Sequence, residues 1–267
     1  MSTEARSNYF YFDPRYLSEL SNRLAATYQA ATPFPHVVID NFIPDEDVID
    51  EVLSEFPAPG SVDWIHYNQQ TEKKLASRDE SQIGSVTRHL LQQFNSSVFC
   101  LFLESLTGIE GIIPDPHFWG GGLHQIERGG FLKIHSDFNR YEKLKLDRRL
   151  NVLLYLNKDW REEYGGYLEL WDRKMTHCVV KTAPAFNRVV IFNTTSFTYH
   201  GHPDPMQSPE GMTRKSLALY YYTNGRKAHE MTKRHSTLFQ ARREGEFGSL
   251  SMKERFRAFF KRDLNRR

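Results

Sequence analysis

Apolar residues recur at helical spacing through most of the first hundred positions. From Pro14 to Ala30 they return every three or four residues, which predicts an amphipathic helix. A second helix is expected after Pro44, where acidic residues in the first turn suit the helix dipole. The same spacing predicts one longer helix over Ser81 to Leu106, ended by Gly108. Between these helices, Pro57 to Lys74 is expected to be loop-rich.

After Gly120 the pattern changes to short apolar runs separated by turn residues such as Gly129-Gly130 and Pro203-Asp-Pro205. Many short strands at this spacing favour a β-sandwich or jelly roll over βαβ units. With the earlier helices packed on one sheet, the expected fold class is α+β. The predicted strands are His36–Phe42, Leu123–Glu127, Phe131–His135, Leu150–Leu156, Tyr167–Trp171, His177–Lys181, Val189–Phe192 and Ser216–Thr223.

Length and composition describe an ordinary globular chain. Its 267 residues, 25% charged and 13% aromatic, can bury one sizeable core, so a single large domain with extensions is expected. No apolar run approaches membrane-spanning length, and the first residues do not resemble a secretory signal. Only two cysteines, Cys100 and Cys178, are present, so no disulfide framework is available. A cytoplasmic, reduced protein is the simplest interpretation.

Charge is unevenly distributed along the chain. Positions 226–267 hold 13 Lys and Arg against 5 Asp and Glu (+8), which leaves 22 against 28 (−6) for the remainder. Such a tail suits an acidic partner, but it carries no nucleic-acid-binding motif, so a solvated helix face is favoured and nucleic acid is not expected. Ser251 to Glu254 has capping-box spacing and precedes an apolar stripe. We therefore predict a C-terminal helix that packs on the core or forms a homodimer interface.

The candidate chemistry centres on Phe131 to Asn139, which contains His135-Ser-Asp137. A His-x-Asp pair on a strand places an imidazole and a carboxylate on the same face. A second histidine would complete the two-His-one-carboxylate triad that holds Fe(II) and leaves coordination positions open. His200 can supply it, and His202 is a rival because strand alternation points both side chains the same way. On its own, His-x-Asp is a weak signal.

Two further residues would suit a dicarboxylate. Arg214 precedes a strand-like run and can grip a carboxylate bidentately, which lysine cannot do. Tyr155 lies in an apolar strand and could donate its hydroxyl to the same group. The structural alternatives are an ordinary charge at a strand end for Arg214 and a core aromatic for Tyr155.

Together these residues resemble a known family. The run Leu153 to Trp160, the Gly165-Gly166 pair, the run Pro184 to Phe192, the distal histidine region and Arg214 resemble Fe(II)/2-oxoglutarate oxygenases of the prolyl hydroxylase type. The similarity covers roughly residues 120–224 and is closest to the hypoxia-sensing enzymes. It implies a double-stranded β-helix, a cupin-like jelly roll, with packed N-terminal helices and a C-terminal helix. The expected regions of this single domain are a helical support (1–119), the catalytic core (120–224) and a basic extension (225–267).

The resemblance also implies roles for individual residues. His135, Asp137 and His200 would be the iron ligands. Arg214 would pair with the distal carboxylate of 2-oxoglutarate, with Tyr155 donating to it.

Three further positions are candidates: Gln125 and Arg148 follow from the family pattern, and Trp171 could line the pocket. Gln125 stands ten residues before the first ligand, where the family often has a tyrosine that contacts the co-substrate. Arg148 and Trp171 are candidate substrate contacts. The interval from His200 to Arg214 is longer than in the hypoxia-sensing enzymes, so the loop there is expected to differ.

The implied activity is hydroxylation of an unactivated C–H bond by O2, with 2-oxoglutarate converted to succinate and CO2 and ascorbate as the expected reductant. The substrate stays open between a prolyl residue of a protein or peptide and a small molecule, because fold and triad do not select it. The rival class is a non-catalytic jelly-roll module that binds a metal or ligand. A zinc hydrolase is a third reading, but it gives Arg214 no role.

Overall fold

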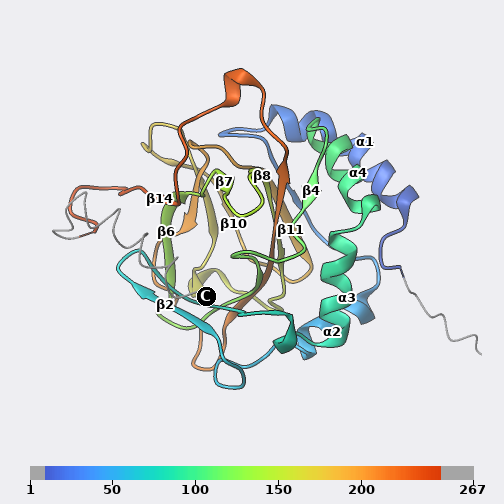
Figure 1. The fold of residues 1–267 in the computed structure, drawn as a ribbon. Helices are drawn as coiled ribbons and strands as arrows, with labels where there is room; N and C mark the ends of the chain where they lie inside the picture. Colours follow the sequence, from blue (N-terminus) through green and yellow to red (C-terminus); the bar gives the residue numbers. More distant parts are fainter. Residues whose placement is uncertain (1–9, 248–267) are drawn as a thin grey trace, which may run out of the picture.

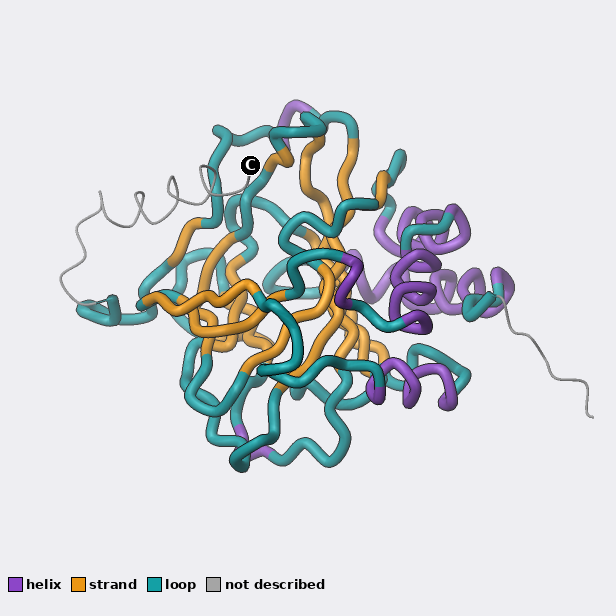
Figure 2. Tube along the Cα trace, turned by 60° about the horizontal axis from the view of Figure 1, so that its bottom comes forward, coloured by secondary structure: helices purple, strands orange, loops and turns teal. Residues whose placement is uncertain are grey.

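The computed structural model describes residues 10–247. Within this range the α-helices gather on one side of a curved sheet assembly, and the strands form the other side (Figures 1 and 2). None of the helices in this range has the length and apolar character needed to cross a membrane. The α-helices are α1 (Pro14–Ala30), α2 (Glu46–Ser54), α3 (Ser85–Phe94) and α4 (Ser97–Thr107).

The strands pair antiparallel in the order β1-β11-β8-β13-β5-β3-β6-β12-β9-β10, with β2, β4, β7 and β14 attached at the sides. This sheet curls into a nearly closed barrel, so the predicted double-stranded β-helix core with packed helices is confirmed. The strands are β1 (His36–Ile39), β2 (Ile65–Gln69), β3 (Glu72–Ala76), β4 (Ile113–Pro114), β5 (Gly122–Ile126), β6 (Phe131–Ser136), β7 (Arg140–Tyr141), β8 (Leu146–Tyr155), β9 (Leu168–Trp171), β10 (Cys178–Thr182), β11 (Arg188–Asn193), β12 (Tyr199–His202), β13 (Arg214–Thr223) and β14 (Leu238–Phe239).

The central strands β8 and β13 divide their side chains between two environments. Leu154 and Leu217 are paired in register and belong to the main hydrophobic core under the helices. Their neighbours Tyr155 and Ser216, also paired, line a cavity on the opposite face. Because successive side chains on a strand point to opposite faces, apolar positions on one face anchor the helices while the other face stays available for chemistry.

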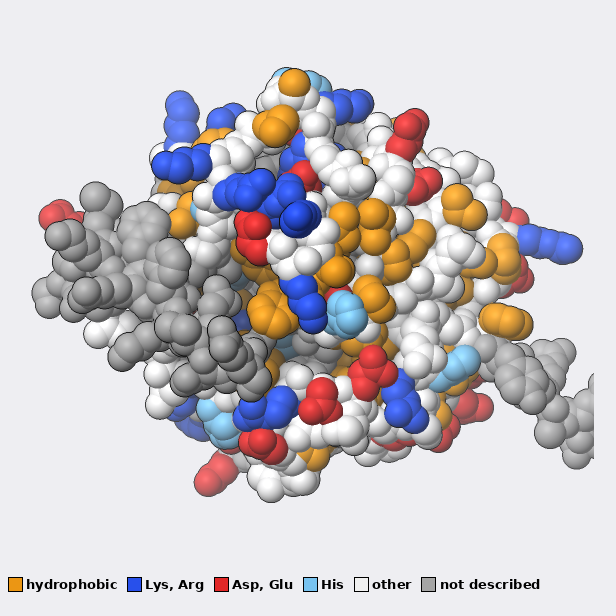
Figure 3. All heavy atoms as spheres, in the orientation of Figure 1, with side chains coloured by type: hydrophobic (Ala, Val, Ile, Leu, Met, Phe, Trp, Pro, Cys, Tyr) orange, Lys and Arg blue, Asp and Glu red, His pale blue; other side chains and the backbone are white. Residues whose placement is uncertain are grey.

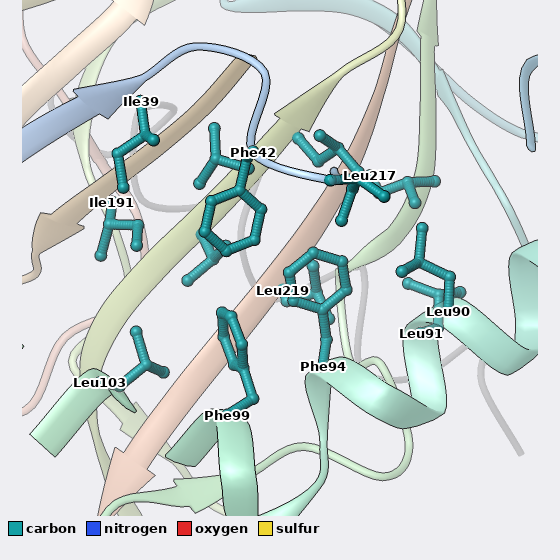
Figure 4. Close-up of a cluster of buried hydrophobic side chains, with 14 of the residues drawn as sticks. Ile39, Phe42, Leu90, Leu91, Phe94, Phe99, Leu103, Ile191, Leu217 and Leu219 are labelled. Atoms are coloured by element: carbon teal, nitrogen blue, oxygen red, sulfur yellow. The ribbon is translucent and has the colours of Figure 1, made fainter. Parts of the chain in front are cut away.

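Aromatic side chains fill the core between the helices and this sheet. Figure 4 shows Phe94 and Phe99 pointing toward Leu217 and Leu219, with Phe42 beside them. The rings of Phe94 and Phe99 meet edge to face at 4.8 Å between centroids. Such pairs add to the stabilisation that burial alone provides.

The single helix predicted over Ser81 to Leu106 is wrong in one respect: α3 and α4 are separated at Asn95 and Ser96. The Ser96 hydroxyl accepts a hydrogen bond from the Phe99 N–H and caps α4. In one continuous helix, Phe94 and Phe99 would point about 140° apart. The break turns both rings into the same core, and Gly108 ends α4 in the left-handed conformation, as predicted.

The segment Pro57 to Lys74 is less irregular than its sequence suggests. It contains β2 and leads through a tight turn into β3. β3 pairs with both β5, through Leu75 and Gln125, and β6, through Glu72 and Leu132. β3 itself (Glu72–Ala76) has no β-branched residue, so backbone pairing with two neighbours decides its structure.

The described part of the basic tail, residues 226–247, packs along the barrel. Leu238 of β14 pairs with Ser136 of β6. Arg242 forms ion pairs with Asp204 and Glu246. Charges of both signs are mixed over the surrounding face (Figure 3). The C-terminal helix predicted from Ser251 onward lies outside the described residues.

The N-terminus of α3 depends on a carboxylate from another element. Gly84 occupies the cap position, which has no side-chain oxygen. Glu55, which follows α2, accepts hydrogen bonds from the backbone N–H groups of Val86 and Thr87 at 3.0 and 2.8 Å. A Cβ at position 84 would collide with the Glu55 carboxyl group, so glycine makes room for this cap.

We predict that Glu55→Gln destabilises the protein by about 1–2 kcal/mol, a usual cost for losing a helix cap. Burial of Glu55 opposes ionisation, but the Thr87 and Val86 hydrogen bonds outweigh it and lower the carboxyl pKa. A lowered folded-state pKa gives stability above the unfolded pKa that is lost as pH falls through the folded one. Urea unfolding of both proteins should therefore converge in acid. Glu51→Gln, an exposed position of α2, is the control; an equal effect there would contradict the cap.

Candidate functional site

Strands β6 and β12 bring the two candidate histidine ligands together. His135 and His200 are direct partners in the antiparallel register, and their ring centroids lie 4.4 Å apart. Gly201 makes the close approach of these strands possible, because a Cβ there would lie 2.7 Å from the Leu132 carbonyl oxygen. Asp137 follows directly after β6 on the same side as His135.

These three side chains form the one His/Cys/Asp/Glu cluster in residues 10–247 whose geometry could hold a metal ion, with ligand atoms within 4.8 Å of one another. Asp137 Oδ1 lies 3.6 Å from His135 Nε2, and Asp137 Oδ2 lies 3.4 Å from His200 Nε2. One ion with metal–ligand bonds of about 2.1 Å can bridge such separations.

Backbone carbonyls orient both imidazoles for coordination. The Nδ1 of His135 lies 2.9 Å from the Lys133 carbonyl oxygen, and that of His200 lies 3.0 Å from the Thr198 carbonyl oxygen. Nδ1 must carry the proton to donate these bonds, so each Nε2 presents a lone pair to the site. Burial, and then the neighbouring His135, lower the pKa of His200 to about 4, which keeps its ring neutral.

Asp137 is held ionised by a buried network. Asn151 donates to its Oδ2 at 2.8 Å, and the Arg148 guanidinium lies 3.1 Å from the same oxygen. Burial opposes ionisation, but Arg148 and then His200 outweigh it and hold the pKa of Asp137 well below its usual range. Two neutral imidazoles and one carboxylate are the donor set of mononuclear Fe(II) oxygenase sites, so these residues fit that metal.

Arg148 is itself almost fully buried, with 1% of its surface exposed. Its guanidinium lies between the rings of Phe138 and Tyr220, 4.4 and 3.6 Å from their centroids, and also donates to Asn151 Oδ1. These contacts make it a support for Asp137, and it does not line the cavity. Trp171 donates to Glu169 and is also outside the lining. A substrate contact for either residue stays a prediction.

The candidate metal ligands open into a cavity that Arg214 and Tyr155 also line. Arg214 is buried, donates from Nε to the Gly166 carbonyl oxygen at 2.7 Å, and approaches the Tyr155 hydroxyl at 3.3 Å. Burial raises the pKa of Tyr155, so its hydroxyl stays protonated and can donate. Gly166 has φ of +68°, and a Cβ there would come within 3.1 Å of the Arg214 side chain.

The structure does not bring Gln125 to this cavity. Its amide nitrogen donates to the Pro57 carbonyl oxygen, and its amide oxygen accepts from the Thr213 hydroxyl. His124 lines the cavity instead. Strand alternation explains why His124 and not Gln125 lines the cavity. Leu123 belongs to the core under the helices, so Gln125, two residues further on, points to the same side. His124 points to the opposite side.

The cavity wall also holds Lys74, which was not among the candidates, and His202, which was considered only as a rival metal ligand. Lys74 reaches it from β3, in a segment that was expected to be loop, and pairs with Glu72 at 3.4 Å. His202 lines it two positions beyond His200, and burial followed by the charge of Arg214 holds its pKa well below the usual range. The alternation noted for His200 and His202 was the available signal for the second residue.

Comparison with known proteins identifies a family model that matches the part of the chain containing this site. Residues 121–222 match the model of the 2OG-Fe(II) oxygenase superfamily. This segment contains His135, Asp137, His200 and Arg214. Over this segment the chain is therefore similar to that superfamily.

The relatives and solved structures it matches are more specific. The chain is 24% identical over 200 residues to prolyl 3-hydroxylase OGFOD1 of Mus musculus. This alignment covers 71% of this chain and 33% of the mouse protein. For Xenopus laevis OGFOD1 the identity is 26% over 205 residues, 72% of this chain and 35% of the relative. The chain thus spans about a third of the length of the curated relatives it matches.

Among solved structures, a Pseudomonas putida prolyl-4-hydroxylase aligns with a TM-score of 0.55 and 18% identity, over 76% of this chain and 100% of that one. A Trichoplax adhaerens prolyl hydroxylase in complex with a hypoxia inducible factor peptide fragment aligns at 0.52 and 19%, over 78% and 91%. The epimerase SnoN from nogalamycin biosynthesis aligns at 0.52 and 14%, over 90% and 91%. At these identities the likeness establishes the fold alone.

We predict that Arg148→Leu destabilises the metal-free protein by about 3–5 kcal/mol, because it leaves the Asp137 carboxylate buried without its cation. Urea unfolding in the presence of a chelator measures the effect. Arg161→Leu is the matched control, since its contact with Glu163 is exposed and should contribute under about 1 kcal/mol. Equal unfolding midpoints for the parent and Arg148→Leu would show that the buried pair does not support the site.

Proposed function

We propose that this chain is an Fe(II)/2-oxoglutarate-dependent dioxygenase that hydroxylates an unactivated C–H bond. One observation carries the proposal: the candidate metal ligands His135, Asp137 and His200 open into the same cavity as Arg214 and Tyr155. A metal-binding module or a zinc hydrolase would need only the three metal ligands. Neither function gives Arg214 and Tyr155 a role. The proposed net reaction consumes the substrate C–H, O2 and 2-oxoglutarate and yields the alcohol, succinate and CO2.

The bound Fe(II) and 2-oxoglutarate would supply the oxygen chemistry, and ascorbate is the proposed reductant that keeps the iron ferrous. The chain's residues supply geometry. His135, Asp137 and His200 would hold the metal and would leave coordination positions open to small molecules. Arg214 binds the distal carboxylate of the co-substrate through two N–H groups, and the protonated Tyr155 hydroxyl donates to the same group.

The rest of the cavity wall excludes water and fixes orientation. Ile126, Leu132, Leu153 and Leu168 contribute apolar side chains to the lining. A water-poor wall strengthens the charge–carboxylate interaction at Arg214 and protects a reactive site from side reactions. Arg148 has the separate role of keeping Asp137 charged and in place.

For the substrate we propose a prolyl residue in a protein or peptide. The curated relatives named above are prolyl 3-hydroxylases, and one structural neighbour was solved with a peptide fragment. Two of the solved neighbours are prolyl hydroxylases, one of them a prolyl-4-hydroxylase. Because these names include both a 3-hydroxylase and a 4-hydroxylase, we propose neither C3 nor C4 of the proline ring as the reacting carbon. SnoN shares the fold, so a small-molecule substrate remains the alternative outcome of the test.

The proposal extends to the whole chain. Residues 1–119 support a catalytic core at 120–224, with 225–267 as an extension of one domain. We propose that this enzyme is cytoplasmic.

The test is succinate formation from 2-oxoglutarate by anaerobically purified protein given Fe(II), ascorbate and air, with proline-containing peptides or metabolite pools. We predict that His135→Ala lowers turnover more than about 100-fold, since it removes a metal ligand. Arg214→Ala should raise the KM for 2-oxoglutarate at least about 30-fold, the equivalent of about 2 kcal/mol. The product should gain one oxygen atom by mass spectrometry.

Arg161→Ala, an exposed arginine outside the site, is the control and should behave as the parent does. The pool that accelerates turnover identifies the substrate class. If the parent neither turns over in any pool nor binds Fe(II) and 2-oxoglutarate in titrations, the oxygenase proposal is wrong and a binding module takes its place.

A further inference from the structure

His202 differs from the other histidines of the cavity. It is 4% exposed and lines the cavity wall, yet neither ring nitrogen has a hydrogen-bond partner among the described residues. Each of the other cavity histidines has one ring nitrogen at a backbone carbonyl: His124 at Gly120, His135 at Lys133 and His200 at Thr198. The backbone therefore orients three of these rings, and His202 is left to face the cavity unpaired.

A buried imidazole without a partner costs folding free energy. Leucine or methionine would fill the same volume without that cost, so packing does not account for the residue. A group that enters the cavity and accepts a hydrogen bond would compensate. The unpaired His202 ring is thus better explained by binding of a ligand in the cavity than by packing within the protein.

The position of His202 indicates which part of a ligand it meets. It lies on β12 two residues beyond His200, across an irregularity in the pairing with β6, and both side chains line the cavity. Arg214 belongs to the same cavity lining. A five-carbon dicarboxylate with one end on the metal at His200 would extend its other carboxylate toward Arg214 and His202.

We propose that His202 is a positioning residue for 2-oxoglutarate, with one imidazole N–H donating to the distal carboxylate that Arg214 binds. This inference rests on the proposed function. A carboxylate only accepts hydrogen bonds, and a neutral imidazole has one donor nitrogen, so the two groups are complementary. His202 then adds a directional contact to the charge of Arg214 and selects ligands that carry the second carboxylate.

The test measures binding and needs no turnover. Protein loaded with Mn(II), which does not support oxygen chemistry here, is titrated calorimetrically with 2-oxoglutarate and with 2-oxopentanoate, which lacks the distal carboxylate. The variants are His202→Leu, which removes the donor, and His202→Gln, which keeps one. His229→Leu is the matched control, because its side chain is 77% exposed and lies outside the cavity lining.

We predict that His202→Leu weakens 2-oxoglutarate binding about 10- to 100-fold, the usual range for a hydrogen bond to a charged group. Its affinity for Mn(II) and for 2-oxopentanoate should change less than about 2-fold, and His202→Gln should recover most of the loss. Without ligand, His202→Leu should unfold at the same or a higher temperature than the parent, because an unpaired polar group has been replaced by an apolar one.

Equal 2-oxoglutarate affinity in the parent and His202→Leu would overturn the inference. An equal loss for both ligands would overturn it too, since that pattern belongs to general disturbance of the cavity. A lower unfolding temperature for ligand-free His202→Leu would also contradict it. Failure of the Mn(II)-loaded parent to bind 2-oxoglutarate would instead remove the proposed function itself.

Discussion

The site depends on the pairing of β6 with β12. This pairing sets His135 directly opposite His200, and it requires the missing side chain of Gly201. Backbone carbonyls on the same two strands, at Lys133 and Thr198, then fix which nitrogen of each imidazole faces the site. The ligand geometry therefore rests on two paired strands, which hold a site more precisely than loops do.

Two buried arginines organise the rest of the cavity. Arg148 compensates the charge of Asp137 at one end, and Arg214 lies beside Tyr155 at the other. Burying a guanidinium without a partner costs free energy, so each arginine requires defined polar partners around it. The first is satisfied within the protein. The second lines the open cavity, where an incoming carboxylate would complete its pairing. The division of β8 and β13 into a helix-facing and a cavity-facing side makes room for both.

Much of this could be predicted from the sequence, for physical reasons. The helix at Pro14–Ala30 and most barrel strands follow from local periodicity, and the His135, Asp137 and His200 cluster from the fact that both strands point these side chains inward. The errors arose where distant contacts decide the outcome. Pairing with β5 and β6 turns a polar segment into β3, and a serine cap divides the helix after Phe94. The co-substrate contact of Gln125 stays a prediction: its side chain shares the face of Leu123 and lies outside the cavity lining.

The most direct measurement is a crystal structure of the protein with Mn(II) and 2-oxoglutarate, with the metal located by its anomalous scattering. We expect one metal peak bonded to His135 Nε2, His200 Nε2 and an Asp137 oxygen. The co-substrate should chelate the opposite face and direct its far carboxylate toward Arg214. A metal held elsewhere, or a fourth protein ligand that closes the coordination sphere, would contradict this expectation.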